Sequence, residues 1–218
     1  QGRILFDFLI YPSGHEKTFS CIFDCHKIEK DELIKKFTLY KMRSSVEIKD
    51  INDQIIAINI DNEEKSFRDP RHKKLPFRAI VTKAKMRNSS SYDDIYKQNR
   101  LKLCVAEGPE EIPRGEALPL DFWMDKTTQV SFNKGCFIGQ EVTARVYHRN
   151  KIRRRLIVVD SRTTITSEAE LPGKGFKYIC QNKDMVLLLA PLEFIETSEL
   201  NNNMQLEWLG KKYNFYLY

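Results

Sequence analysis

The chain has 218 residues, 41% of them hydrophobic, which is enough for one large or two modest domains and excludes a chain that is disordered throughout. No apolar run approaches the roughly 18 residues of a membrane-spanning helix, so association with membranes is not expected. The net charge of +6 favours an anionic ligand or partner, and the five irregularly spaced cysteines are typical of a reducing compartment and argue against a disulfide scaffold.

The first predicted elements are a hairpin and a helix. Residues 4–11 and 18–24 are apolar and rich in β-forming residues, and Pro12 and Gly14 between them indicate a turn. Apolar side chains then recur at intervals of three and four from Ile28 to Tyr40, a spacing that predicts an amphipathic helix at residues 29–40.

Further strands and a second helix are expected before residue 108. The apolar runs that predict strands lie at residues 46–48, 55–60 and 77–82. Residues 92–106 show helical spacing and are followed by Gly108 and Pro109, which end a helix. Strand pairs mixed with helices predict an α+β fold, in which helices cover one face of a mainly antiparallel sheet.

After residue 153 the sequence becomes a series of short β-like runs. They lie at residues 156–159, 177–180, 185–189, 204–208 and 212–218. Turn residues separate them at a spacing typical of a small sandwich or barrel. We therefore divide the chain into an α+β region at residues 1–150 and a C-terminal β-barrel domain at residues 151–218.

The segment most suited to chemistry surrounds Cys136. Residues 130–132 are expected to end a strand, and residues 140–148 to form a helix. Gly135 and Gly139 lie on either side of the Cys-Phe-Ile tripeptide, and glycine permits positive φ or close approach of a ligand. Loops between a strand and a helix often build binding sites in this way.

Local charges favour the thiolate form of Cys136. The thiol precedes a helix N-terminus, and Lys134 is close in sequence. Glu141 and Arg145 stand four residues apart in the favourable order and are expected to brace the helix. On spacing alone, an inert, buried thiol in a tight turn remains an equal alternative.

The motif resembles the signature of a known family. Residues 134–141, Lys-Gly-Cys-Phe-Ile-Gly-Gln-Glu, followed by Val-Thr-Ala-Arg, are similar to the signature of the YgfZ family, folate-binding relatives of the glycine-cleavage T-protein. Residues 1–7 resemble the early Gln/Lys-Gly-Arg strand of that family, and residues 114–121 resemble the stretch before its signature. The resemblance covers about residues 1–155, and the C-terminal part fits by its β pattern.

The resemblance implies both a fold and a function. The fold is a ring of two T-protein-like α+β lobes and a small C-terminal β-barrel around a central folate cavity. The function is assembly or maintenance of iron-sulfur clusters, chiefly four-iron four-sulfur ones, for client enzymes. Cys136 would be a ligand to a bridging cluster or a redox-sensitive thiol, and an A-type carrier protein would supply the remaining ligands.

The resemblance also implies a cofactor site for tetrahydrofolate or a derivative. Asp121 stands near the position of a carboxylate that grips the pterin in T-proteins, where most relatives have the longer Glu. The other residues expected to contact the cofactor are Arg3, Lys134, Gly135, Gly139, Gln140, Glu141 and Arg145. The chain begins at Gln1 without an initiator Met or a leader, so we expect it to start inside a longer protein. A bacterial cytoplasm is the expected compartment, with the mitochondrial matrix as the alternative.

Two other functions stay open. A tetrahydrofolate-dependent aminomethyltransferase would share the fold, but such enzymes need a catalytic Asp beside the folate and generally lack the cysteine. A tRNA-modification accessory protein would use the basic residues 149–155, although no aromatic-interleaved RNA motif accompanies them. Whether the chain is an enzyme is therefore undecided, and nucleic-acid binding is not expected.

The remaining cysteines carry weaker signals. Cys21 and Cys25 are four residues apart in a predicted strand and precede His26, but no second pair of ligands follows. Because a structural zinc site needs four converging ligands, we expect no metal there. Cys104 and Cys180 lie in apolar runs and are expected in the core.

Overall fold

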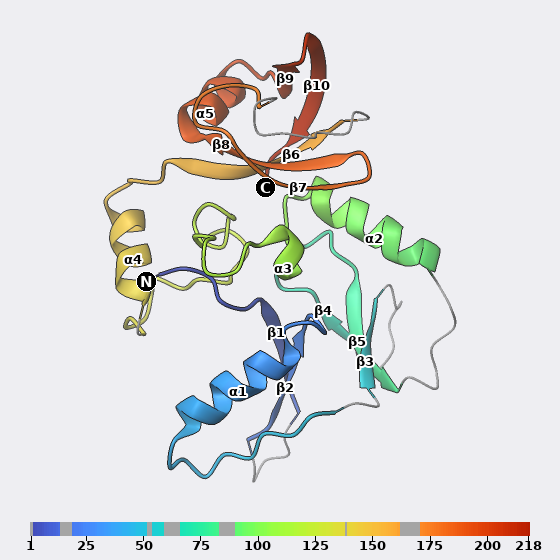
Figure 1. The fold of residues 1–218 in the computed structure, drawn as a ribbon, viewed down its shortest axis with the longest axis vertical. Helices are drawn as coiled ribbons and strands as arrows, with labels where there is room; N and C mark the ends of the chain where they lie inside the picture. Colours follow the sequence, from blue (N-terminus) through green and yellow to red (C-terminus); the bar gives the residue numbers. More distant parts are fainter. Residues whose placement is uncertain are drawn as a thin grey trace.

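A computed structural model describes residues 2–13, 19–51, 54–58, 66–82, 90–137, 139–161 and 171–218. Its strands form three sheets in which every pairing is antiparallel, and helices flank them (Figure 1). The predicted α+β class is therefore confirmed. No helix in these ranges has the length and apolar character needed to cross a membrane.

The first lobe is the predicted hairpin with its helix. Strands β1 (Phe8–Pro12) and β2 (Cys21–Cys25) pair, and α1 (Lys30–Lys41) packs on them. An aromatic cluster joins the three elements, because the ring of Phe23 lies 5.3 Å from that of Phe8 and 4.9 Å from that of Phe37. The turn predicted at Gly14 lies outside the described residues.

The second sheet has the order β3-β5-β4, with β3 (Gln54–Ile58), β4 (Ser66–Arg68) and β5 (Phe77–Thr82). The prediction for residues 77–82 is confirmed, whereas residues 59–60 of another predicted strand lie outside the described part. The strand predicted at residues 46–48 is wrong. Val46 is 53% exposed, and its carbonyl accepts a hydrogen bond from the side chain of Lys41 in place of a neighbouring strand.

The helices α2 (Ser90–Lys102) and α3 (Gly108–Glu111) connect this sheet to the centre of the molecule. The predicted helix at residues 92–106 ends earlier than expected, because Cys104 adopts a left-handed conformation with φ 50°. Cys104 is fully buried, as its apolar neighbours predicted.

The C-terminal part forms a five-stranded sheet in the order β7-β8-β6-β10-β9. Its strands are β6 (Arg154–Asp160), β7 (Lys177–Asn182), β8 (Met185–Pro191), β9 (Gln205–Trp208) and β10 (Lys211–Tyr216). All five match predicted β runs. Among the strands that the structure describes, β7 and β9 lie at the two edges of this sheet, so the sheet does not close into the predicted barrel. Helix α5 (Leu192–Leu200) was not predicted, and it buries Ile195 in the core on one face of the sheet.

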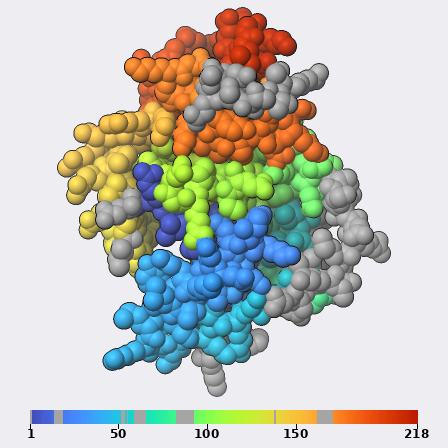
Figure 2. All heavy atoms as spheres, viewed as in Figure 1, coloured from blue at the N-terminus to red at the C-terminus, as the bar shows by residue number. Residues whose placement is uncertain are grey.

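The other face of this sheet packs against the centre of the chain (Figure 2). Leu101 and Trp123 share one buried cluster with Leu156 and Leu187. The indole Nε1 of Trp123 donates a hydrogen bond of 2.7 Å to the carbonyl of Leu156. This core therefore runs across the boundary expected between residues 150 and 151, and the division into two domains stays a prediction.

Candidate functional site

Residues 134–137, which we call the cysteine loop, lie just before α4 (Gln140–His148), and Cys136 is exposed in this loop. Gly139 forms the N-cap of α4 in a left-handed conformation with φ 91°. The amide of Gln140 donates 2.9 Å to the carbonyl of Phe137, which turns the chain into the helix. The predicted helix is therefore confirmed, and Gly139 has the positive φ that a glycine in this loop permits. The alternative of a buried thiol in a tight turn is wrong, because Cys136 is exposed.

The side chain of Gln140 braces this loop. Its Oε1 accepts hydrogen bonds from Lys134 Nζ at 2.8 Å and from the Phe137 amide at 3.4 Å. Its Nε2 donates to the carbonyl of Ser131 at 2.7 Å. The Lys134 ammonium also lies 4.6 Å from the centre of the Phe137 ring. The loop is thus fixed from both sides of Cys136 by one amide side chain.

The strand end predicted at residues 130–132 is not formed. Those residues follow a bent course, and the ring of Phe132 stacks on Tyr147 with 3.9 Å between the ring centres and an angle of 7°. His148 contacts the same ring edge to face, at 5.8 Å. Stacking against α4 takes the place of strand pairing here, because aromatic burial stabilises the segment without a neighbouring strand.

The N-terminal segment packs against the start of α4. Gly2 has φ 71°, and a Cβ at this position would lie 3.2 Å from the Gly139 carbonyl oxygen and 3.3 Å from Val142 Cβ. Arg3 extends from this contact and donates a hydrogen bond to the carbonyl of Glu116. The backbone of the predicted site residue Arg3 therefore lies beside the loop, while its guanidinium is bound to the Glu116 carbonyl.

Asp121 lies apart from the loop, in a largely buried polar environment. Its side chain is 10% exposed, and Arg154 Nη2 approaches one carboxylate oxygen at 3.6 Å. Burial raises the pKa of Asp121, and the positive charges of Arg154, Arg155 and Lys177 oppose that rise. Lys177 also pairs with Glu116 at 3.2 Å. The carboxylate expected to grip a pterin is thus surrounded by cations.

The predicted site residues fall into two groups. The first comprises the loop and α4 residues Lys134, Gly135, Cys136, Gly139, Gln140, Glu141 and Arg145. The second comprises Arg3 and Asp121, which are connected through Glu116 and Lys177. No hydrogen bond or ion pair between described side chains joins the two groups. Glu141 and Arg145 are both exposed and form no ion pair within the described part of the chain, so the expected brace on the helix is not observed.

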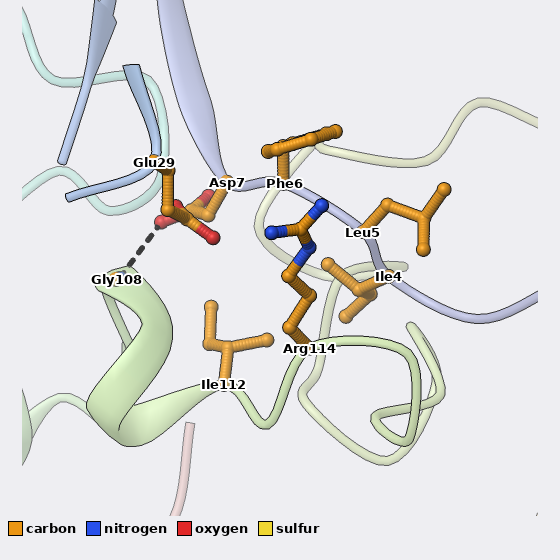
Figure 3. Close-up of a pocket in the computed structure, with 8 residues that line it drawn as sticks. All are labelled: Ile4, Leu5, Phe6, Asp7, Glu29, Gly108, Ile112 and Arg114. Atoms are coloured by element: carbon orange, nitrogen blue, oxygen red, sulfur yellow. Dashed lines mark hydrogen bonds between the residues drawn. The ribbon is translucent and has the colours of Figure 1, made fainter. Parts of the chain in front are cut away.

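A shallow hollow, too narrow to hold a water molecule, lies between the N-terminal segment, the start of α1 and α3 (Figure 3). Asp7 and Glu29 point toward each other in it. Asp7 accepts hydrogen bonds from the Gly108 amide and from Gln129 Nε2, each at 3.3 Å, and burial raises its pKa. Burial also raises the pKa of Glu29. The sequence gives no signal for this pair, because its members come from separate elements.

A buried ionic network lies next to Asp7 and was also missed. Its cations are Arg71, Arg78 and Arg100, and its carboxylates are Asp24, Asp69, Glu107 and Glu111. Arg71 contacts Asp69 and Glu107 at 2.7 Å each. Burial alone would raise the pKa of Glu107, but the nearby arginines lower it to about 2. The network joins the hairpin, the second sheet and α2.

The described residues hold no group of three or more His, Cys, Asp or Glu side chains that could bind a metal ion. We expect no metal at Cys21 and Cys25. This stays a prediction, because the turn before them lies outside the described residues. Within the described ranges Cys136 offers one thiol ligand only, which is insufficient for a metal cluster.

Comparison with known proteins identifies relatives of the chain. The mitochondrial iron-sulfur cluster assembly factor IBA57 homolog of Pyricularia oryzae is 30% identical over 175 residues, which cover 72% of this chain and 45% of that protein. Human mitochondrial IBA57 is 29% identical over 198 residues, covering 79% of this chain and 54% of that protein. The chain is a relative of the mitochondrial IBA57 proteins. No family model matches it.

The similarity to IBA57 confirms the YgfZ-type resemblance, since IBA57 is the mitochondrial counterpart of YgfZ. A Cryptococcus neoformans IBA57 homolog is 50% identical over 66 residues, which are 30% of this chain and 18% of that protein. The chain spans about half the length of the IBA57 proteins it matches over most of its sequence. Its own loop provides an accessible thiol, an adjacent ammonium group and an exposed aromatic ring, which together suit contact with another molecule at the surface.

Proposed function

We propose that the chain takes part in iron-sulfur cluster assembly and maintenance, with Cys136 as the residue that contacts the cluster or its carrier. The observation that carries the proposal is the exposure of Cys136 on a loop braced by Gln140. The names of the IBA57 relatives agree with this role, and the word mitochondrial in those names favours a mitochondrial compartment over the bacterial cytoplasm.

The chemistry of the proposed contact follows from the thiol. A cysteine thiolate is the usual protein ligand of iron-sulfur clusters, and a cluster requires about four such ligands. Cys136 would supply one, and a partner such as an A-type carrier would supply the others. The client proteins would be enzymes with four-iron four-sulfur clusters. Lys134 carries a positive charge beside the loop, and such a charge favours the thiolate over the thiol.

We also propose that tetrahydrofolate or a derivative binds near Asp121. Its carboxylate can accept hydrogen bonds from the amide and amino groups of a pterin. The cations Arg154 and Lys177 would attract the negatively charged tail of a folate. The T-protein-like ring of lobes is the arrangement that would place Asp121 on a central cavity.

The burial of one arginine argues against the alternative function, that of a tRNA-binding accessory protein. Arg155 is buried and forms an ion pair with Asp125, and its guanidinium lies 4.4 Å from the centre of the Trp123 ring. Arg154 approaches Asp121. Two of the arginines expected to contact phosphates therefore interact within the protein.

The test is the absorption spectrum of the chain mixed anaerobically with a cluster-loaded A-type carrier, for the wild type and for Cys136→Ser. We expect a new thiolate-to-iron absorption in the wild type that the variant lacks. Folate binding is tested separately by titrating tetrahydrofolate against the wild type and Asp121→Asn. Identical spectra for the wild type and Cys136→Ser would refute the role of the thiol, and equal folate affinities would refute that of Asp121.

A further inference from the structure

The outward side of α4 continues the surface of the cysteine loop. Val142, Arg145 and Arg149 follow each other at helical spacing, so they share one face of the helix. All three are exposed, with Val142 at 47%. Phe137, which precedes the helix, is 75% exposed. Large apolar side chains with this exposure, rimmed by polar residues, mark interaction sites.

This surface is strongly basic. Its exposed cations are Lys134, Arg145 and Arg149, and the exposed Lys151 and Arg153 follow α4 in the sequence. Within the described part of the chain, none of them forms an ion pair. Glu141 is the acidic residue of the loop and helix. A surface with several uncompensated charges of one sign attracts a partner of opposite charge and accelerates its association.

The loop is prepared for binding in the free chain. Gln140 fixes the backbone at Ser131 and Phe137 and holds the Lys134 ammonium. A side chain that is ordered before association loses less conformational entropy when the complex forms, which increases affinity.

We propose that residues 134–137 together with the outward side of α4 form a basic docking face for an acidic protein surface. Phe137 and Val142 provide its apolar centre, and the cations provide its rim. This arrangement matches the apolar core and polar rim of protein interfaces. A protein fits better than RNA because this face pairs one exposed ring, that of Phe137, with the aliphatic Val142, whereas RNA-binding modules commonly stack two or three bases on several aromatic side chains. The inference rests on the proposed function, in which the same partner supplies the remaining cluster ligands.

Charge reversal tests the docking face. The variant Arg145→Glu/Arg149→Glu is compared with Lys211→Glu/Lys212→Glu, which changes the net charge equally on β10, far from α4 (Figure 1). The association rate of each with an apo A-type carrier is measured at low and high salt. We expect the α4 variant to associate about tenfold more slowly at low salt and the control to change less than about twofold. Phe137→Ala should raise the dissociation rate about tenfold.

The apo carrier separates this inference from the proposed function, because it holds no cluster for Cys136 to bind. The docking face predicts that the wild-type chain associates with the apo carrier faster than the α4 variant does, whatever the cluster spectrum shows. Equal rates for the α4 variant and its β10 control would overturn the docking face, even if Cys136→Ser abolishes the cluster spectrum. Loss of tRNA binding in the α4 variant, with carrier binding unchanged, would also overturn it.

Discussion

The ion pair between Arg100 and Glu111 offers a strong test of the buried network. Two hydrogen bonds join the side chains, at 2.7 and 2.8 Å, and the side chains are 3% and 2% exposed. Arg100 also donates to the Val105 carbonyl, and Glu111 accepts from the Glu107 amide at 2.9 Å. Each charge is therefore removed from water and compensated mainly by the other.

Arg100→Met keeps most of the side-chain volume but leaves the Glu111 carboxylate buried without its hydrogen-bonded cation, with Lys97 Nζ 3.9 Å away as a remaining charge. Breaking a buried pair in this way costs about 3–5 kcal/mol, which is a large share of the stability of a domain. The double variant Arg100→Met/Glu111→Met removes both charges and should recover at least about 1 kcal/mol. Full recovery is not expected, because the Glu107 amide and the Val105 carbonyl lose their partners, at about 1–3 kcal/mol for an unsatisfied buried group.

The measurement is urea unfolding followed by circular dichroism, with Lys183→Met as control. Lys183 pairs with Asp94 at 2.6 Å, but both side chains are about half exposed, so its loss should cost at most about 1 kcal/mol. A loss below about 1 kcal/mol for Arg100→Met would refute the account of the network. Additive losses at Arg100 and Glu111 would refute the coupling between them.

Three further predictions concern the loop and the network. Gly139→Ala should destabilise the chain by about 1–2 kcal/mol in urea unfolding because of its left-handed backbone, whereas Gly135→Ala, with open space around it, should change stability by less than about 0.5 kcal/mol. Because the folded-state pKa of Glu107 is lowered to about 2, its stabilising effect should be present above the unfolded pKa of about 4.3 and be lost as pH falls toward 2. Acid titration of stability should lose this component in Glu107→Gln, and an unchanged profile would contradict the assignment. A thiol reagent should modify Cys136 first in the folded chain and leave the buried Cys104 unmodified, so Cys136→Ser should lack the fast phase.

Helices and strands were predictable where the apolar side chains on one face of the element determine how it packs. The strand at residues 77–82 and the helix at residues 140–148 have the predicted bounds. The limits of periodicity appear at the two ends of the pattern that predicted α1, because Ile28 and Tyr40 fit the apolar pattern but are 73% and 65% exposed. Pattern alone does not reveal how far a neighbouring element extends over a helix. In the described part of the chain, the packed region reaches Leu33 and Phe37 but not the two ends of the pattern.

Helix α5 was missed because its sequence follows directly from β8. Residues 185–190 are buried in the sheet, and Leu192, Phe194 and Ile195 continue the apolar run with a single charged residue, Glu193, among them. The backbone changes at Pro191, which becomes the N-cap, and Ile195 then packs on the sheet. A proline in this position is compatible with both a strand end and a helix start, so the choice between them depended on the tertiary contact.

The two glycines of the signature turn out to have different physical roles. Gly139 is required by its own left-handed φ, so its side of the loop is fixed by the fold. Gly135 has neither a left-handed backbone nor a neighbouring atom that a Cβ would meet. The fold therefore gives no reason for glycine at position 135. Its missing side chain leaves the space beside the exposed Cys136 thiol open, and that space is where a second molecule must approach if the thiol is to share a ligand.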